Sequence, residues 1–204
     1  MKFTTRLTLI SAELKSHAPF TLLGALSGIA CMLLFRNAEY HIIHRLFYIF
    51  HPAHVVLSAM VTASIFKLHT RKKNFLLVLV VGYLGSIVIA TLSDSIIPYL
   101  AETLLGMEAH KHIGFIEEWY IVNPAALAGI FIACFWPKTK FPHAGHVLLS
   151  TWASSFHMIM AMAGQISVWI ITVSFVFLFL AVWLPCCISD IVFPLLFVKP
   201  SKDD

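Results

Sequence analysis

The chain has 204 residues, of which 59% are hydrophobic and only 12% charged, and its mean hydropathy is +0.87. A soluble domain normally carries about 25% charged residues, so this composition excludes a soluble all-α protein. The basic residues flank apolar segments, which gives no support to a nucleic-acid partner. We therefore expect an all-α integral membrane protein whose surroundings are the lipid bilayer.

Long apolar segments recur along the chain, and about 17–25 such residues suffice for a helix to cross a bilayer. Six spans are expected, at residues 19–35, 46–66, 74–98, 120–136, 143–163 and 168–198. With a cytoplasmic N-terminus, 11 of the 14 basic residues lie inside, as the positive-inside rule requires. Both termini are then cytoplasmic, in the cell membrane (the inner membrane, if the source is bacterial).

The two ends of the chain flank these spans. Phe3, Leu7, Ile10 and Leu14 form one helical stripe, which predicts that residues 1–18 are an amphipathic segment lying on the inner leaflet. Residues 199–204 are expected to be a short cytoplasmic tail.

Three landmarks occur twice, in the same order. Residues 51–58 read HPAHVVLS and residues 143–150 read HAGHVLLS. Downstream, residues 91–98 (TLSDSIIP) and 187–194 (CISDIVFP) share Ser-Asp-x-x-x-Pro. Upstream, Pro19 and Pro124 are each followed by x-x-Leu-x-Gly. Conserved order with variable connector lengths indicates an internal duplication.

The duplication predicts two three-span repeats, residues 19–100 and 120–198. Because three is odd, the second copy is inverted in the membrane, and a pseudo-two-fold axis lies in the membrane plane. Such 3+3 inverted repeats are typical of secondary transporters. Between the repeats we expect an acidic extracytoplasmic loop, residues 101–119, with Glu102, Glu108, His110, His112, Glu117 and Glu118.

The repeated motifs carry metal-ligating side chains. Histidines at positions i and i+3 share a helix face, so each pair can offer two imidazoles to one ion. We expect His51, His54 and Asp94 to converge near the outer face, and His143, His146 and Asp190 near the inner face. Two imidazoles and a carboxylate suit Zn, Fe, Mn, Co or Ni as divalent ions.

Asp94 and Asp190 are the only two of the ten acidic residues that fall within the expected spans. A charged residue in a span costs about 3 kcal/mol on insertion scales, which marks both as functional candidates. They could instead cap helices interrupted before Pro98 and Pro194. Secondary candidates for the site are His157, Ser93, Ser189 and Cys186, and His157 could equally be a buried histidine bonded to a neighbouring helix.

Three functions are compatible with these patterns. The preferred one is a small secondary transporter or channel that moves a divalent transition-metal ion through the paired clusters. The alternatives are an intramembrane zinc-dependent hydrolase acting on a lipid, with one open site, and a haem-binding membrane electron carrier. No nucleotide-binding loop is present. Small residues in spans 1 and 4 suggest contacts for a homodimer.

Overall fold

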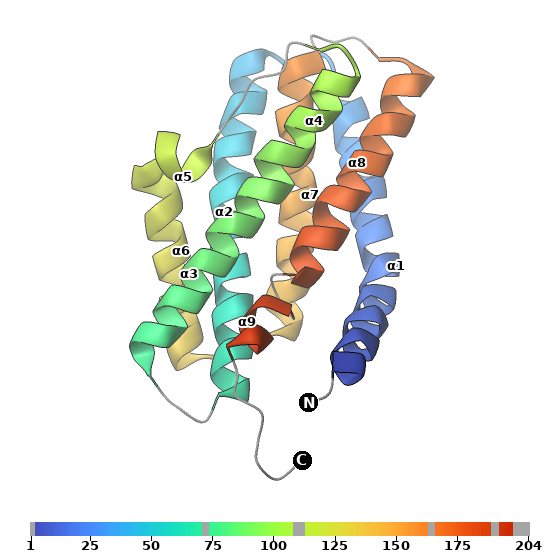
Figure 1. The fold of residues 1–204 in the computed structure, drawn as a ribbon. Helices are drawn as coiled ribbons and strands as arrows, with labels where there is room; N and C mark the ends of the chain where they lie inside the picture. The colour runs from blue at the N-terminus through green and yellow to red at the C-terminus, as the bar shows by residue number, and fades with distance from the viewer. Residues whose placement is uncertain (1–2, 71–73, 108–112, 163–165, 189–191, 198–204) are drawn as a thin grey trace.

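The computed structural model describes residues 3–70, 74–107, 113–162, 166–188 and 192–197. These residues are helical with short connections and no strand, which confirms the all-α prediction (Figure 1). In chain order the elements are α1 (Phe3–Phe35), α2 (Tyr40–His69), α3 (Phe75–Thr91), the π-helical turn η1 (Leu92–Ile96), α4 (Ile97–Leu104), α5 (Gly114–Glu117), α6 (Trp119–Phe135), α7 (Lys140–Met162), α8 (Val168–Cys187) and α9 (Phe193–Leu196).

Several of these helices fit a membrane protein. Among the described residues, four helical segments are long and apolar enough to cross a bilayer: Ala18–Phe35, Tyr40–His69, Phe75–Leu104 and Val168–Pro185. A fifth, Trp119–Phe135, is apolar but shorter. Large hydrophobic side chains are exposed along the bundle, which suits a surface that contacts lipid tails.

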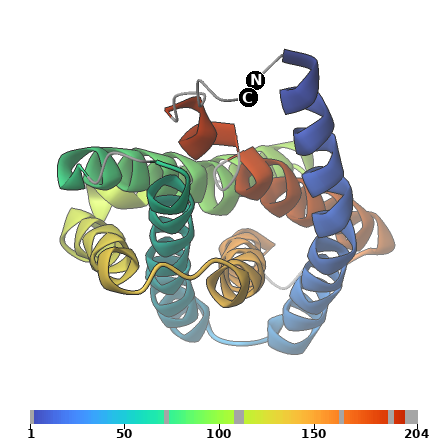
Figure 2. The same ribbon diagram turned by 90° about the horizontal axis from the view of Figure 1, so that it is seen from below.

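The helices form one upright bundle in which successive long helices run in opposite directions (Figure 1). Viewed along the bundle, α2 and α7 lie side by side in the middle (Figure 2). Helices α3 and α6 pack beside α2, whereas α1 and α8 pack beside α7. The first turns of α1 and the short helix α9 lie at the same end of the bundle (Figure 1).

A π-helical turn interrupts the third long helix where the sequence reads Leu-Ser-Asp-Ser-Ile. Pro98 lacks an N–H group and cannot donate to the carbonyl oxygen of Asp94 four residues earlier. The N–H of Ile97 bonds to Leu92 O instead, one residue further back than in an α-helix. This widened turn holds Ser93, Asp94 and Ser95, all buried.

Two helices are longer than expected. Helix α2 begins at Tyr40 instead of residue 46 and continues through Pro52, so its histidine motif lies mid-helix. Helix α4 runs past Pro98 to Leu104 and ends before Gly106, whose φ of 67° is a left-handed conformation that favours glycine. Residues 101–104 are therefore helical and do not belong to the acidic loop. Residues 1–18 show no separate element, because α1 is continuous from Phe3.

Small residues bring the helices together within the chain. A Cβ atom added to Gly28 of α1 would lie 2.6 Å from Ser155 Oγ of α7. One added to Gly129 of α6 would lie 2.1 Å from Val56 O of α2. The small residues of spans 1 and 4 suggested a homodimer, but glycines of both spans pack against other helices of the same chain. We therefore do not propose a dimer.

Candidate metal centre

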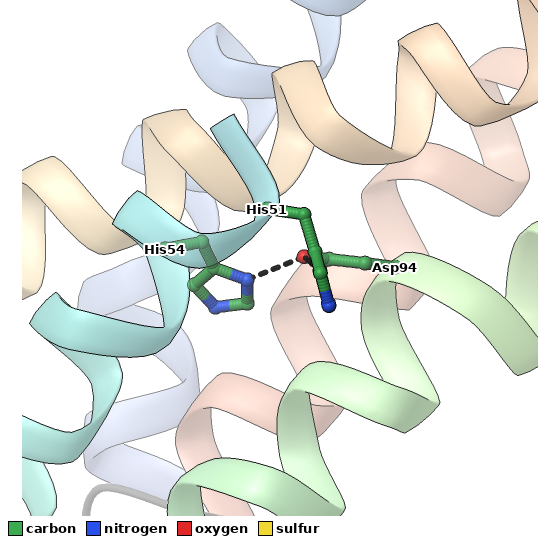
Figure 3. Close-up of side chains that lie close together, drawn as sticks. All are labelled: His51, His54 and Asp94. Atoms are coloured by element: carbon green, nitrogen blue, oxygen red, sulfur yellow. Dashed lines mark hydrogen bonds and ion pairs between the residues drawn. The ribbon is translucent and has the colours of Figure 1, made fainter. Parts of the chain in front are cut away.

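Three of the predicted ligands converge where α2 faces η1. His51 Nδ1 lies 2.9 Å from Asp94 Oδ2, and His54 Nδ1 lies 2.6 Å from the same oxygen. Figure 3 shows the three side chains close together, with a dashed line from the His54 ring to the carboxylate of Asp94. An ionised carboxylate only accepts hydrogen bonds, so beside it each imidazole donates from Nδ1–H.

The second carboxylate oxygen of Asp94 is held by hydroxyl groups. Ser93 Oγ donates to Oδ1 over 2.7 Å, and Ser150 Oγ of α7 donates over 2.9 Å. Ser154 Oγ donates to Ser93 O over 2.9 Å and lies 3.5 Å from Asp94 Oδ1. Donors on α2, η1 and α7 therefore surround one buried carboxylate and support it as an anion.

The dimensions of this group suit a small cation. One ligand atom from each of His51, His54 and Asp94 can be chosen so that all three lie within 4.8 Å of one another. Tetrahedral Zn²⁺ with bonds of ~2.0–2.1 Å separates its ligand atoms by about 3.3 Å. To admit an ion between these atoms, each imidazole would carry its proton on Nε2 instead of Nδ1, and the two Nδ1···Oδ2 distances would lengthen by less than about 1 Å. All three side chains are at most 2% exposed, so bulk water does not compete for them.

The second histidine motif does not form a distant site at the other end of the bundle. The ring of His146 lies 5.5 Å from that of His54, centroid to centroid, and the ring of His143 lies 5.0 Å from that of His146. The prediction of two separate clusters on opposite faces is therefore wrong as regards these histidines. The reason is the length of α2, which places its motif midway along the helix, level with the motif of α7.

The remaining predicted residues fall into three groups. Asp190 and Ser189 lie outside the described residues, as does the side chain of Cys186. His157 lies apart from the centre, and its Nδ1 is 2.7 Å from Glu102 Oε1. This is the bond to a neighbouring helix that the sequence suggested as the alternative role of His157. Ser93 is a hydrogen-bond partner of Asp94.

Sequence reasoning missed several polar residues of the core. Ser150 and Ser154 reach the centre, and Ser150 is the last residue of the repeated His-x-x-His-Val-x-Leu-Ser motif, which was a usable signal. Glu102 is 0% exposed, which corrects the expectation that Asp94 and Asp190 are the only acidic residues within spans. The apolar residues on both sides of Glu102, followed by Gly106, indicated a longer helix.

Glu118 was also assigned to the acidic loop, yet it is buried beside α2. It is 6% exposed and accepts a hydrogen bond from Tyr48 Oη. Gly114, at the start of α5, lies against the centre, because a Cβ atom there would be 2.8 Å from His51 Nε2. The α5–α6 corner therefore covers one side of the His51 ring.

Comparisons of the sequence and the structure with known protein families, curated proteins and solved structures found no match.

Proposed function

We propose that this protein carries a divalent transition-metal ion across a membrane, through a centre formed by His51, His54 and Asp94. The observation that carries the proposal is the convergence of two imidazole nitrogens on one buried carboxylate oxygen. Neutral imidazole with carboxylate favours zinc and its neighbours over Ca²⁺ or Mg²⁺, which prefer oxygen ligands. One negative charge with neutral ligands holds a divalent ion less tightly than a thiolate site would, which suits release.

His54 gives the ion a next position. Its Nδ1 faces Asp94, while its Nε2 has no hydrogen-bond partner among the described residues and its ring lies beside His146. His143 follows one turn further toward the start of α7. An ion leaving Asp94 would therefore pass successive imidazoles along the α2–α7 interface.

We include the 3+3 inverted repeat in the proposal, and the pattern of helix contacts supports it. The contacts between the long helices are symmetric. If α1 is exchanged with α6, α2 with α7 and α3 with α8, each pair of long helices in contact becomes a pair that is also in contact. His54 and His146, which meet at the centre, occupy the same position of the repeated motif. In transporters of this design the substrate site lies at the interface of the repeats.

Equivalent glycines make equivalent close contacts in the two halves. Gly24 and Gly129 each close the Pro-x-x-Leu-x-Gly landmark. A Cβ atom on Gly24 would be 3.0 Å from Thr151, and one on Gly129 would be 3.0 Å from Ala59. Thr151 and Ala59 stand five residues after the second histidine of their own motifs. The same interhelical contact therefore recurs in both predicted repeats.

The burial of the centre favours transport over lipid hydrolysis. A hydrolase must place an ester or amide bond beside its ion, but these three side chains are at most 2% exposed. A haem would need an open face beside a ligating ring, whereas Phe47 stacks on His51 at 5.2 Å with an interplanar angle of 6°. A bare ion is the cargo that fits this packing best. We retain six spans and cytoplasmic termini as part of the proposal.

Zinc uptake into proteoliposomes tests the proposal. Asp94→Asn removes the anionic ligand and His54→Gln removes the shared imidazole, so both variants should lose saturable uptake. His69→Gln is the matched control, because His69 is an exposed histidine in the last turn of the same helix, bonded to Ile65 O. Uptake that is unchanged in Asp94→Asn and His54→Gln would contradict transport through this centre.

A further inference from the structure

A second buried polar pair joins α4 to α7. His157 Nδ1 lies 2.7 Å from Glu102 Oε1, and the two side chains are 4% and 0% exposed. The surrounding core is apolar and includes Phe47, Ala101, Phe156, Met158 and Met162. Burying titratable groups in such a setting costs free energy, which marks both residues as functional candidates.

Glu102 is held quite differently from Asp94. Asp94 receives hydrogen bonds at both oxygens, from two imidazoles and two short-range hydroxyls. Among the described residues, the side chain of Glu102 has a single hydrogen-bond partner, His157 at Oε1, and its Oε2 has none. Burying a carboxylate as an unpaired anion costs much free energy. Sharing a proton with an imidazole lowers that cost. The pair is thus suited to hold one exchangeable proton.

Phe47 connects this pair to the metal centre. Its ring stacks on His51 at 5.2 Å and meets the His157 ring edge-on at 5.6 Å. Phe47 is 1% exposed, so its ring has little free space. A shift of the His51 ring on ion entry would therefore press on Phe47 and, through it, on the His157 ring.

Ionisable side chains also lie on the described parts of the neighbouring elements. Helix α4 packs against η1, α7 and α8. Asp94 of η1 is bonded within the metal centre, Tyr99 belongs to α4 itself, and residues 168–185 of α8 carry no acidic or basic side chain. On α2, the Tyr48 hydroxyl donates to Glu118, and His51 lies on the far side of Phe47.

We propose that the Glu102–His157 pair is the proton-binding site that couples metal transport to a proton gradient. The inference rests on the proposed function. With the centre empty, the pair holds one proton between Oε1 and Nδ1. Ion entry at His51 releases that proton to water on the side from which the ion came. After the ion leaves on the opposite side, the pair takes a proton from that side, so metal and proton move in opposite directions.

Proteoliposomes that contain a zinc indicator and a pH indicator test this coupling. The wild-type protein should exchange Zn²⁺ for protons, and an opposing pH gradient should accelerate uptake. Glu102→Gln keeps the size of the side chain but cannot carry the proton. We expect its proton counter-flow to fall about tenfold, within the usual range of coupling effects. Equilibrium Zn²⁺ affinity, measured by calorimetry, should change by no more than this coupling factor, since the centre keeps its ligands.

Glu117→Gln is the matched control, because Glu117 is an exposed carboxyl in α5, outside the buried pair. It should behave as wild type, and Glu102→Asp should retain coupling. Proton counter-flow at the wild-type ratio in Glu102→Gln would overturn the inference and leave metal transport intact. A rate of Zn²⁺ uptake by the wild-type protein that does not depend on the pH gradient would also overturn the inference. Wild-type protein that moves no Zn²⁺ at all would contradict both proposals.

Discussion

His54 and His146 occupy the same place in the two copies of the repeated motif, and their rings meet 5.5 Å apart where α2 lies beside α7. His54 bonds to Asp94 directly, whereas His146 meets the centre through its ring contact with His54. In the proposed transport route, the pair marks the boundary between the position where an ion rests and the position to which it moves.

This boundary predicts that binding and transport separate in a His146 variant. His146→Gln should keep Zn²⁺ affinity within about threefold of wild type, because the three ligands of the centre remain. Its uptake rate should fall about tenfold, since the next imidazole on the route is missing. Calorimetry and proteoliposome uptake on one preparation measure both. A loss of affinity as large as that of His54→Gln would instead place His146 among the ligands.

The hydroxyl groups around Asp94 should stabilise the fold even without an ion. Ser93→Ala removes a donor to Oδ1, and we expect a loss of about 0.6–2 kcal/mol in unfolding free energy. Ser95 is the control two residues away, because it is buried and its Oγ has no partner among the described residues. Thermal unfolding in detergent should therefore show Ser95→Ala to be neutral or slightly stabilising. Equal effects of the two substitutions would argue against an anionic Asp94.

Gly114 should control the position of the His51 ring. In Gly114→Ala the new Cβ would lie 2.8 Å from His51 Nε2, so the ring must move. Misplacing a ligand through a neighbour typically costs about 10–100-fold in metal affinity. Gly145→Ala is a fair comparison, because its Cβ would also meet an atom at 2.8 Å, but that atom is a methyl group of the flexible Leu57. Calorimetric titration with Zn²⁺ should show a weakened Gly114→Ala and a nearly unchanged Gly145→Ala.

The sequence predicted the helical class and the convergence of His51, His54 and Asp94, because motif spacing along a helix determines which side chains share a face. It did not predict how far along the bundle the two motifs lie. That depends on where α2 begins, and the span was expected to begin at residue 46, whereas the helix begins at Tyr40.

Glu102 was missed for a related reason. The Pro98 position and the acidic residues that follow suggested a loop from residue 101, but a proline within the first turn of α4 is compatible with helix. The partnership of Glu102 with His157 joins residues 55 positions apart, and only the packing of α4 on α7 brings them together.

Zinc-edge X-ray absorption on protein loaded with one equivalent of Zn²⁺ tests the central claim most directly. The account predicts nitrogen and oxygen ligands at ~2.0–2.2 Å, with an imidazole contribution that decreases in His54→Gln and stays unchanged in His69→Gln. Sulfur ligands at ~2.3 Å would place the ion on cysteines, and a spectrum unaffected by His54→Gln would place it elsewhere. Either result would contradict a metal centre at His51, His54 and Asp94.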